Sequence, residues 1–139
     1  MKTILDFEQI ADHYSAKING HNPAVSSISR CDKVIMQNDR ILLIEETRYK
    51  KKDLTDFRLY SREVIENVKK MWGSFAILIA SQNLSTIQGK DRYYILLIDK
   101  LDSRNARALA NLIKVLHRYC NGAITTIKFK ERQFDRIHP

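Results

Sequence analysis

Two acidic side chains on one predicted β-hairpin are the residues of this sequence best suited to carry chemistry. In residues 32–48, two apolar runs rich in β-branched residues flank Asn38-Asp39, a dipeptide that suits a tight turn. Counting outward from this turn sets Asp32 opposite Glu45, and the alternation of side chains along a strand places both on one face. The two carboxylates repel each other, and partial burial would raise the pKa of one of them unless a cation lies between them.

The chemistry that this pair predicts is binding of a hard divalent cation. Mg²⁺ takes one or two carboxylates and keeps several waters, so two acids are enough for a site. The alternative is that both acids lie at a solvated strand end and are neutralised by Arg and Lys side chains. Spacing alone leaves both interpretations open.

Composition predicts a soluble globular protein with a polyanionic partner. The chain has 139 residues, 44% hydrophobic and 29% charged, with a formal net charge of +8, which favours phosphate-rich partners through counterion release. We prefer nucleic acid over a membrane surface because no basic amphipathic helix stands out and no apolar run is long enough to span a bilayer. The two cysteines cannot form a disulfide framework, so a cytoplasmic location is expected.

Hydrophobic periodicity and turn residues predict the elements that position the acids. We expect one α/β domain, in which hairpin, helix and buried strand form a βαβ crossover with parallel pairing. The predicted elements are a helix over 3–16 capped by Thr3, a short strand over 24–30, the hairpin, a helix from 53 or 55 to 71 ended by Gly73, buried strands over 74–81 and 93–98, a polar linker over 82–92, a helix over 103–120 and a last strand over 123–129.

The densest basic run follows the hairpin and leaves the strand end that carries Glu45. Such a run ordinarily forms a solvated loop. Beside two carboxylates, however, a cationic loop is where a phosphodiester backbone would lie, with a tyrosine available to stack on an exposed base. The run consists of Arg48, Tyr49, Lys50, Lys51 and Lys52.

This order of elements resembles the PD-(D/E)XK nuclease superfamily, which has the restriction-endonuclease-like or Holliday-junction-resolvase-like fold. The resemblance covers residues 3–81, with 93–129 as an added strand–helix–strand. In that family an Asp opens the second strand, and Glu or Asp, any residue, then Lys lies on the third. Asp32 and Glu45 match the two acidic positions, with twelve intervening residues.

The resemblance implies a divalent-metal-dependent endonuclease that acts on DNA rather than RNA. Asp32 and Glu45 would hold Mg²⁺ or Mn²⁺, together with the main-chain carbonyl group of Glu46. Glu8 is the candidate for the acid that the first helix often contributes. Resolvase-like members are commonly homodimers, and no membrane partner is expected.

One departure from the family motif concerns the catalytic lysine, because Thr47 occupies its place. A threonine hydroxyl can orient water but brings no positive charge. Three repairs stay open: Lys50 reaches back from the loop, Lys69 or another basic residue of the following helix supplies the cation, or the register shifts so that Glu46, Thr47 and Arg48 form the motif. The third is least favoured because it turns Glu46 away from Asp32.

Two further functions compete with a nuclease. A nuclease-like subunit that binds nucleic acid or an assembly partner without cleaving it would explain Thr47. A small-ligand or nucleotide-binding domain is disfavoured, because the four glycines are isolated and neither a P-loop nor a dinucleotide fingerprint can be written.

Overall fold

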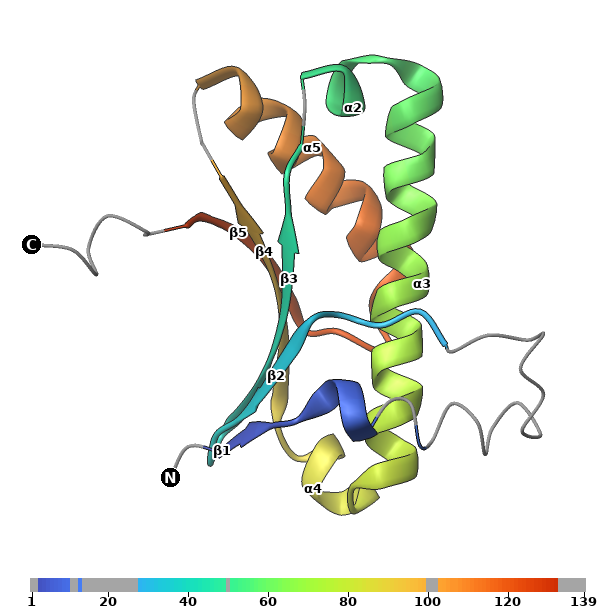
Figure 1. Ribbon diagram of the computed structural model, residues 1–139, viewed down its shortest axis with the longest axis vertical. Helices are drawn as coiled ribbons and strands as arrows, with labels where there is room; N and C mark the ends of the chain where they lie inside the picture. The colour runs from blue at the N-terminus through green and yellow to red at the C-terminus, as the bar shows by residue number, and fades with distance from the viewer. Residues whose placement is uncertain (1–2, 11–12, 14–27, 50, 100–102, 133–139) are drawn as a thin grey trace, which may run out of the picture.

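The computed structural model describes residues 3–10, 13, 28–49, 51–99 and 103–132, which form a mixed α/β fold around a five-stranded sheet (Figure 1). The sheet order is β1-β2-β3-β4-β5; the first three strands pair antiparallel, and β3, β4 and β5 pair parallel. The strands are β1 (Thr3–Leu5), β2 (Lys33–Met36), β3 (Arg40–Thr47), β4 (Asp91–Ile98) and β5 (Thr126–Glu131). The predicted mixed α/β class is therefore confirmed.

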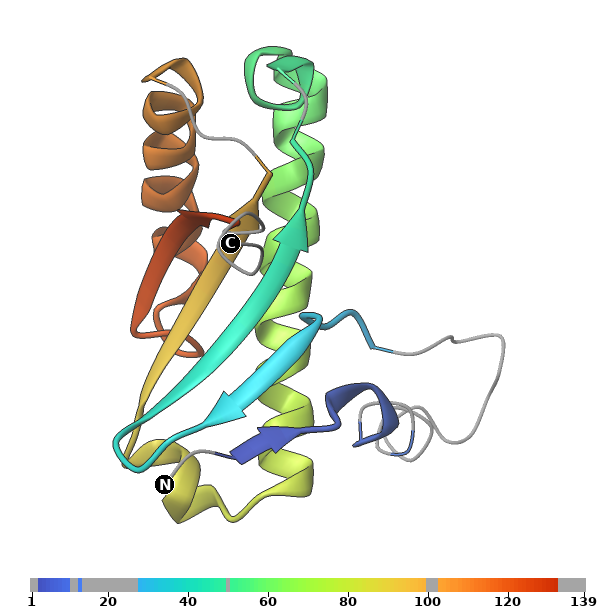
Figure 2. The same ribbon diagram turned by 60° about the vertical axis from the view of Figure 1, so that its left-hand side comes forward.

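The long helices cover one face of this sheet (Figures 1 and 2). The helices are α2 (Lys51–Thr55), α3 (Phe57–Ser81), α4 (Leu84–Gln88) and α5 (Ser103–Cys120). The longest, α3, starts after Asp56, whose carboxylate accepts the N–H groups of Arg58 and Leu59 at 3.0 and 3.1 Å and so caps the helix. The helix runs behind β2 and β3, whereas α5 packs beside β5.

The predicted hairpin is confirmed, including its two-residue loop. The backbone N–H of Gln37 donates to the carbonyl group of Arg40 at 2.9 Å, and the paired register extends to Lys33 opposite Ile44. Alternate side chains of the hairpin, among them Val34, Ile41 and Leu43, are fully buried under the helices. Glu45 is the next residue on that face.

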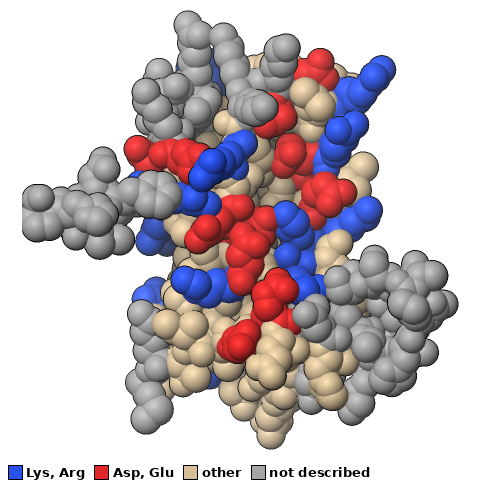
Figure 3. Space-filling view, in the orientation of Figure 1, with Lys and Arg blue, Asp and Glu red and all other residues tan. Residues whose placement is uncertain are grey.

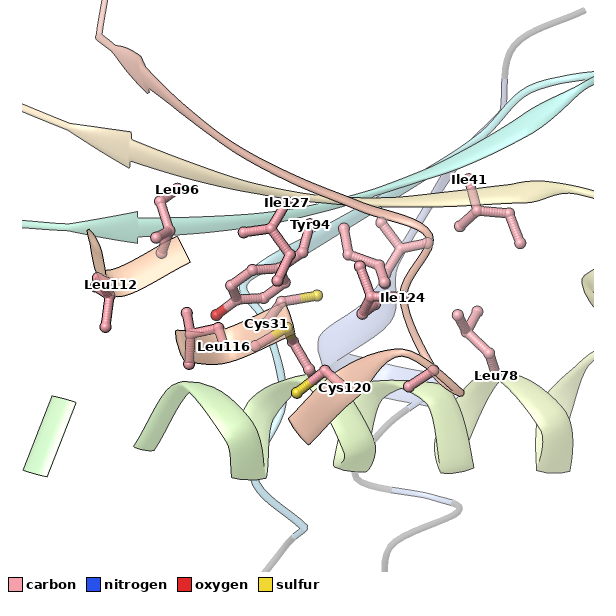
Figure 4. Close-up of a cluster of buried hydrophobic side chains, with 14 of the residues drawn as sticks. Cys31, Ile41, Leu78, Tyr94, Leu96, Leu112, Leu116, Cys120, Ile124 and Ile127 are labelled. Atoms are coloured by element: carbon pink, nitrogen blue, oxygen red, sulfur yellow. The ribbon is translucent and has the colours of Figure 1, made fainter. Parts of the chain in front are cut away.

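One hydrophobic core fills the space between the sheet and the helices (Figure 4). Tyr94 and Leu96 extend into it from β4, and Leu112 and Leu116 from α5. Both cysteines, Cys31 and Cys120, are free thiols that pack in the same core. Buried residues at 109, 112, 116 and 120 give α5 a regular apolar stripe.

The predicted strand over 74–81 is wrong, because α3 continues through Gly73 to Ser81. A short continuous apolar run fits a buried helix as well as a buried strand. Gly73 has another role, since a Cβ atom there would lie 1.8 Å from the carbonyl oxygen of Ser29. The glycine lets the chain that leads to β2 cross directly against the helix.

The predicted N-terminal helix is also wrong in its first residues. Thr3–Leu5 form the edge strand β1, with Ile4 opposite Ile35, and helical backbone occupies residues 7–10. Asp6 rather than Thr3 caps this turn, through a 3.3 Å hydrogen bond from the N–H of Gln9. A three-residue strand is too short to produce a periodic signal.

The remaining boundaries are mixed. The predictions for 93–98 and 103–120 are confirmed as parts of β4 and as α5, while the linker 82–92 contains α4 and the start of β4. The last strand begins at Thr126 because residues 121–123 form the turn after α5. Residues 28–30 are not a strand, and 24–27 lie outside the described residues. No described helix is long and apolar enough to cross a membrane.

Candidate functional site

Asp32 and Glu45 lie side by side where the hairpin meets α3. Asp32 precedes β2; its backbone N–H donates to the carbonyl group of Ile44 at 3.0 Å, and its Oδ2 accepts the N–H of Glu46 at 2.7 Å. Asp32 is therefore hydrogen-bonded to the residues before and after Glu45. Its N–H bonds to Ile44, which in the register of the hairpin is opposite Lys33, so the pairing is displaced by one residue at this end. The two acids nevertheless lie next to each other, as predicted.

Glu45 is an acid buried within the helix-covered face of the sheet. Its side chain is 6% exposed, and its Oε2 accepts a hydrogen bond from Nζ of Lys70. Its Oε1 is buried without a hydrogen-bond partner among the described residues. Burial raises the pKa of Glu45 to about 7; Lys70 lowers this pKa, and the negative charge of Asp32 raises it. A buried carboxylate oxygen without a donor is costly, so this atom calls for a proton or a cation.

Lys70 supplies the positive charge of this site from α3. Burial alone would lower the pKa of Lys70, but the hydrogen bond and charge of Glu45, with the charges of Asp32 and Glu63, raise it overall. The ammonium group therefore stays protonated at neutral pH, with three acids close enough to influence it.

Lys70 belongs to a row of polar side chains on α3. Glu63, Asn67, Lys70 and Ser74 follow the four–three–four spacing of one helix face. Asn67 and Ser74 are buried, and Oγ of Ser74 accepts the backbone N–H of Cys31 at 2.9 Å. This last bond ties the residue before Asp32 to the helix that carries Lys70.

Asn67 links α3 to two tyrosines beside the carboxylates. Its Oδ1 accepts the hydroxyl of Tyr94 at 2.9 Å, and its Nδ2 donates to the hydroxyl of Tyr49 at 3.1 Å and to the carbonyl group of Glu63 at 2.7 Å. Burial raises the pKa of both tyrosines, and the negative charge of Glu45 contributes to this shift. Tyr49 is thus held against α3 rather than presented on a free loop.

The basic run after the hairpin is only partly a loop. Lys51 and Lys52 begin α2, which corrects the prediction of a loop over 48–52, and Lys50 lies outside the described residues. Arg48 is exposed and pairs with Asp99, the residue after β4, at 3.1 Å. A basic run followed by Asp-Leu-Thr has no sequence signal that separates one helical turn from a loop.

The residues predicted by name to replace the motif lysine do not lie beside the two carboxylates in the described part of the chain. Thr47 ends β3, and it makes no hydrogen bond to Asp32 or Glu45 within the described part of the chain. Lys69 is 58% exposed and lies 3.9 Å from Glu66, away from the carboxylates. Lys70, which sequence reasoning did not single out, is the basic residue at the site. The polar row on an otherwise apolar helix face was the available signal.

The side chains of Glu8 and Glu46 point elsewhere, although the prediction for Glu46 concerned its main-chain carbonyl group. The carboxylate of Glu46 accepts a hydrogen bond from Arg132 at 2.9 Å, on the sheet face opposite Glu45. Glu8 is exposed, and its carboxylate pairs with Arg30 at 2.9 Å, two residues before Asp32. Neither side chain contacts Asp32 or Glu45, although the backbone N–H of Glu46 donates to the Asp32 carboxylate.

Acidic side chains gather in the middle of one face of the molecule, with basic side chains around them (Figure 3). Part of this charge is paired, since Arg132 also approaches Asp99 at 3.4 Å. Because acidic and basic side chains are mixed on this face, an anionic ligand can bind near the acids only if a bound cation neutralises their negative charge.

The donor set fits a magnesium ion held by few protein ligands. No group of three or more His, Cys, Asp and Glu side chains arranged for a metal occurs among the residues that the structure describes. Mg²⁺, however, commonly uses one or two carboxylates, with waters and substrate phosphates as its other ligands. Asp32 and the unpaired Oε1 of Glu45 meet that requirement. Cys31 does not contribute, because burial raises the pKa of its thiol to about 12.

Comparison of the chain with protein-family models, curated proteins and solved structures found no match. The class that the fold defines is thus a mixed α/β domain with two carboxylates and a lysine at the junction of a hairpin and a crossover helix.

Proposed function

We propose that this protein is a divalent-metal-dependent nuclease with a restriction-endonuclease-like core, which hydrolyses phosphodiester bonds of DNA. The observation that carries the proposal is Glu45, a buried carboxylate with one oxygen on Lys70 and the other without a donor, beside Asp32. An arrangement of two acids and one cation matches the chemical requirements of the PD-(D/E)XK site.

The order of strands supports the same proposal. An antiparallel hairpin carries both acids, a helix follows, and β4 then pairs parallel to β3. The family order predicted this parallel strand at 74–81, but that segment belongs to α3, and β4 is the parallel strand that follows the hairpin and the helix. What supports the proposal is therefore the succession of hairpin, helix and parallel strand. The net charge of +8 supports a phosphate-rich substrate.

In the proposed mechanism, Asp32 and Glu45 would hold the divalent ion and Lys70 would act on the phosphate. The chemistry that Mg²⁺ supplies in such a site is a more acidic water and stabilisation of negative charge on the phosphoryl oxygens. The ammonium group of Lys70 stands next to Glu45, where it orients the attacking water or neutralises charge that develops on the phosphate. The N–H of Glu46 fixes the orientation of the Asp32 carboxylate.

Lys70 takes the place that Thr47 leaves vacant in the motif. Only the tip of the lysine must reach the phosphate, so an ammonium group from α3 can serve instead of one from β3. Among the repairs considered from the sequence, a basic residue of the following helix is the one that the geometry favours.

Cleavage assays on matched isosteres test the proposal. Asp32→Asn and Glu45→Gln should each abolish Mg²⁺- or Mn²⁺-dependent cleavage of DNA, because each removes one metal-binding charge while preserving side-chain shape. Glu46→Gln is the control, since its carboxylate lies on the other sheet face with Arg132. Equal cleavage by wild type and both isosteres would overturn the proposal.

The same assay separates the second candidate, a nuclease-like protein that binds nucleic acid without cutting it. The presence of Thr47 where the family motif has a lysine favours this candidate. It would show salt-sensitive DNA binding, no cleavage with either metal ion, and binding unchanged in Asp32→Asn and Glu45→Gln.

A further inference from the structure

The outer face of α5 carries positive charge without any acid. The helix contains Arg104, Arg107, Lys114 and Arg118 and neither Asp nor Glu, which is unusual for an exposed helix face. Arg107, Lys114 and Arg118 are exposed, and none of them pairs with a described acid. Contrary to the expectation from the sequence, α5 is a basic amphipathic helix.

These cations form a line along the helix. Residues 107, 111, 114 and 118 recur at four–three–four spacing, so Arg107, Asn111, Lys114 and Arg118 share one face. From Arg107 to Arg118 the line advances eleven residue steps, or about 16 Å at about 1.5 Å per step. One strand of nucleic acid carries a phosphate about every 3.4 Å along a duplex axis, so the line can follow several phosphates.

A pocket with aromatic walls lies at the N-terminal part of this line. Its volume is about 290 Å³, and its lining includes Leu54, Phe57, Tyr60, Ala108 and Asn111. The side chain of Phe57 is 85% exposed. This volume is near the lower limit of small-ligand sites and suits a single planar ring system.

We propose that α5 and this pocket form a binding surface for single-stranded nucleic acid, with one unpaired base in the pocket. A cationic line that follows the backbone beside aromatic rings that stack on bases is the general form of single-strand binding sites. Phe57 and Tyr60 supply the rings, and the amide of Asn111 can bond to a base edge. A duplex keeps its bases stacked and paired, so it can use the charges but not the pocket.

Two other partners fit the surface less well. A membrane-binding helix needs a free apolar face, whereas the apolar stripe of α5 is buried in the core. An acidic protein would meet the charges but would leave the aromatic pocket without a planar ligand.

The surface is separate from the two acids. The α5 helix packs beside β5, whereas Asp32 and Glu45 lie at the β2–β3 hairpin (Figures 1 and 2). The proposal therefore goes beyond cleavage, and it would stand even if the protein cut no DNA.

Fluorescence anisotropy in EDTA tests the proposal on the full chain, with a labelled single strand of about 15 nucleotides, its duplex, and polyglutamate. The variant Arg107→Ala/Lys114→Ala/Arg118→Ala should bind the single strand at least tenfold more weakly at about 50 mM salt. Its salt slope should be smaller by about 2, because each phosphate contact to a single strand contributes about 0.7. The matched control is Lys33→Ala/Arg40→Ala/Lys128→Ala, which removes three exposed cations outside α5.

The pocket has its own test. Phe57→Ala should weaken binding of the single strand about fivefold or more, as expected for loss of base stacking, and should leave duplex binding unchanged. Leu84→Ala is the control, because Leu84 is a 45% exposed apolar residue of α4.

Four results would overturn the proposal: an unchanged salt slope in the α5 variant, equal losses in the control triple, equal effects of Phe57→Ala and Leu84→Ala, or polyglutamate binding as tight as that of the single strand. If cleavage depends on Asp32 and Glu45 but the α5 variant binds normally, only the proposed binding surface is wrong. If binding depends on α5 but no DNA is cleaved, only the proposed nuclease activity is wrong.

Discussion

Lys70 and Glu45 lie 25 positions apart in the sequence and meet only because α3 folds back across the hairpin. The hairpin itself could be predicted, since a turn dipeptide and side-chain alternation define which acids face each other. The partner cation could not be predicted in this way. A lysine on a helix reaches either the sheet or the solvent, and one position separates Lys70 from Lys69, which is 58% exposed.

The first prediction at this scale concerns Lys70. Lys70→Met should reduce cleavage about 100-fold or more, because it removes a fixed positive charge from the reacting phosphate. It should also raise the pKa of Glu45 above its value of about 7, since Lys70 lowers that pKa in the folded protein. Activity assays and an NMR pH titration of the Glu45 carboxyl group provide the two measurements.

Lys69→Met is the matched control, because it removes the same charge from the neighbouring position. A catalytic role for Lys70 predicts normal cleavage and an unshifted Glu45 in this control. Similar losses in both variants would show that only the total charge of α3 matters.

At the scale of elements, Gly73 shows why the long helix was hard to predict. Glycine commonly ends helices, and the apolar run after it resembles a buried strand. Here the glycine lies within α3, because the carbonyl group of Ser29 approaches too closely for a Cβ atom. That contact is between residues distant in sequence, so no local pattern reveals it.

Gly73→Ala should therefore destabilise the protein by about 1–3 kcal/mol, the usual cost of an overpacked contact. The new Cβ would lie 1.8 Å from a backbone oxygen, which cannot move as a flexible side chain can. Because the same segment leads to Asp32, cleavage should also fall. Denaturant unfolding and the DNA-cleavage assay measure the two effects.

Gly89→Ala serves as the control for this prediction. Gly89 caps α4 in right-handed backbone geometry, and a Cβ atom there would come no closer than 3.4 Å to Ser85. Its free energy of unfolding should change by no more than about 0.5 kcal/mol. Equal stability of the two variants would contradict the close approach at Gly73.

At the scale of the whole molecule, the sheet joins the two parts that the sequence suggested as core and addition. Strand β4 belongs to residues 93–129 in that division, yet it lies between β3 and β5. Its Tyr94 bonds to Asn67 of α3 across the core. Strand order depends on pairing between distant segments, so spacing along the chain could indicate the strands but not that β4 pairs with both β3 and β5.

We predict that the chain unfolds in a single cooperative transition. Both thiols are buried, Cys31 near the hairpin and Cys120 at the end of α5, and burial raises their pKa values to about 12 and about 11. The thiols should stay protonated and inert near neutral pH and react only on unfolding. Alkylation of each cysteine, read by mass spectrometry, should follow the same denaturant dependence as far-UV circular dichroism.

Two separate midpoints for the cysteines would contradict this prediction and would indicate that the strand–helix–strand portion melts independently. A Cys120→Ser variant with Cys31 retained checks that alkylation of one thiol does not itself trigger unfolding.

The position of Trp72 has a practical consequence. It is the single tryptophan of the chain, its indole N–H donates to the carbonyl group of Tyr119 at 2.9 Å, and its ring lies against the site of Gly122. The residue is thus located where α3 meets the end of α5. The side chain of Trp72 is 42% exposed, so its fluorescence already reflects partial contact with solvent. Separation of α3 from the end of α5 would break its hydrogen bond and expose the ring further, so its emission maximum should shift to longer wavelength without any attached dye.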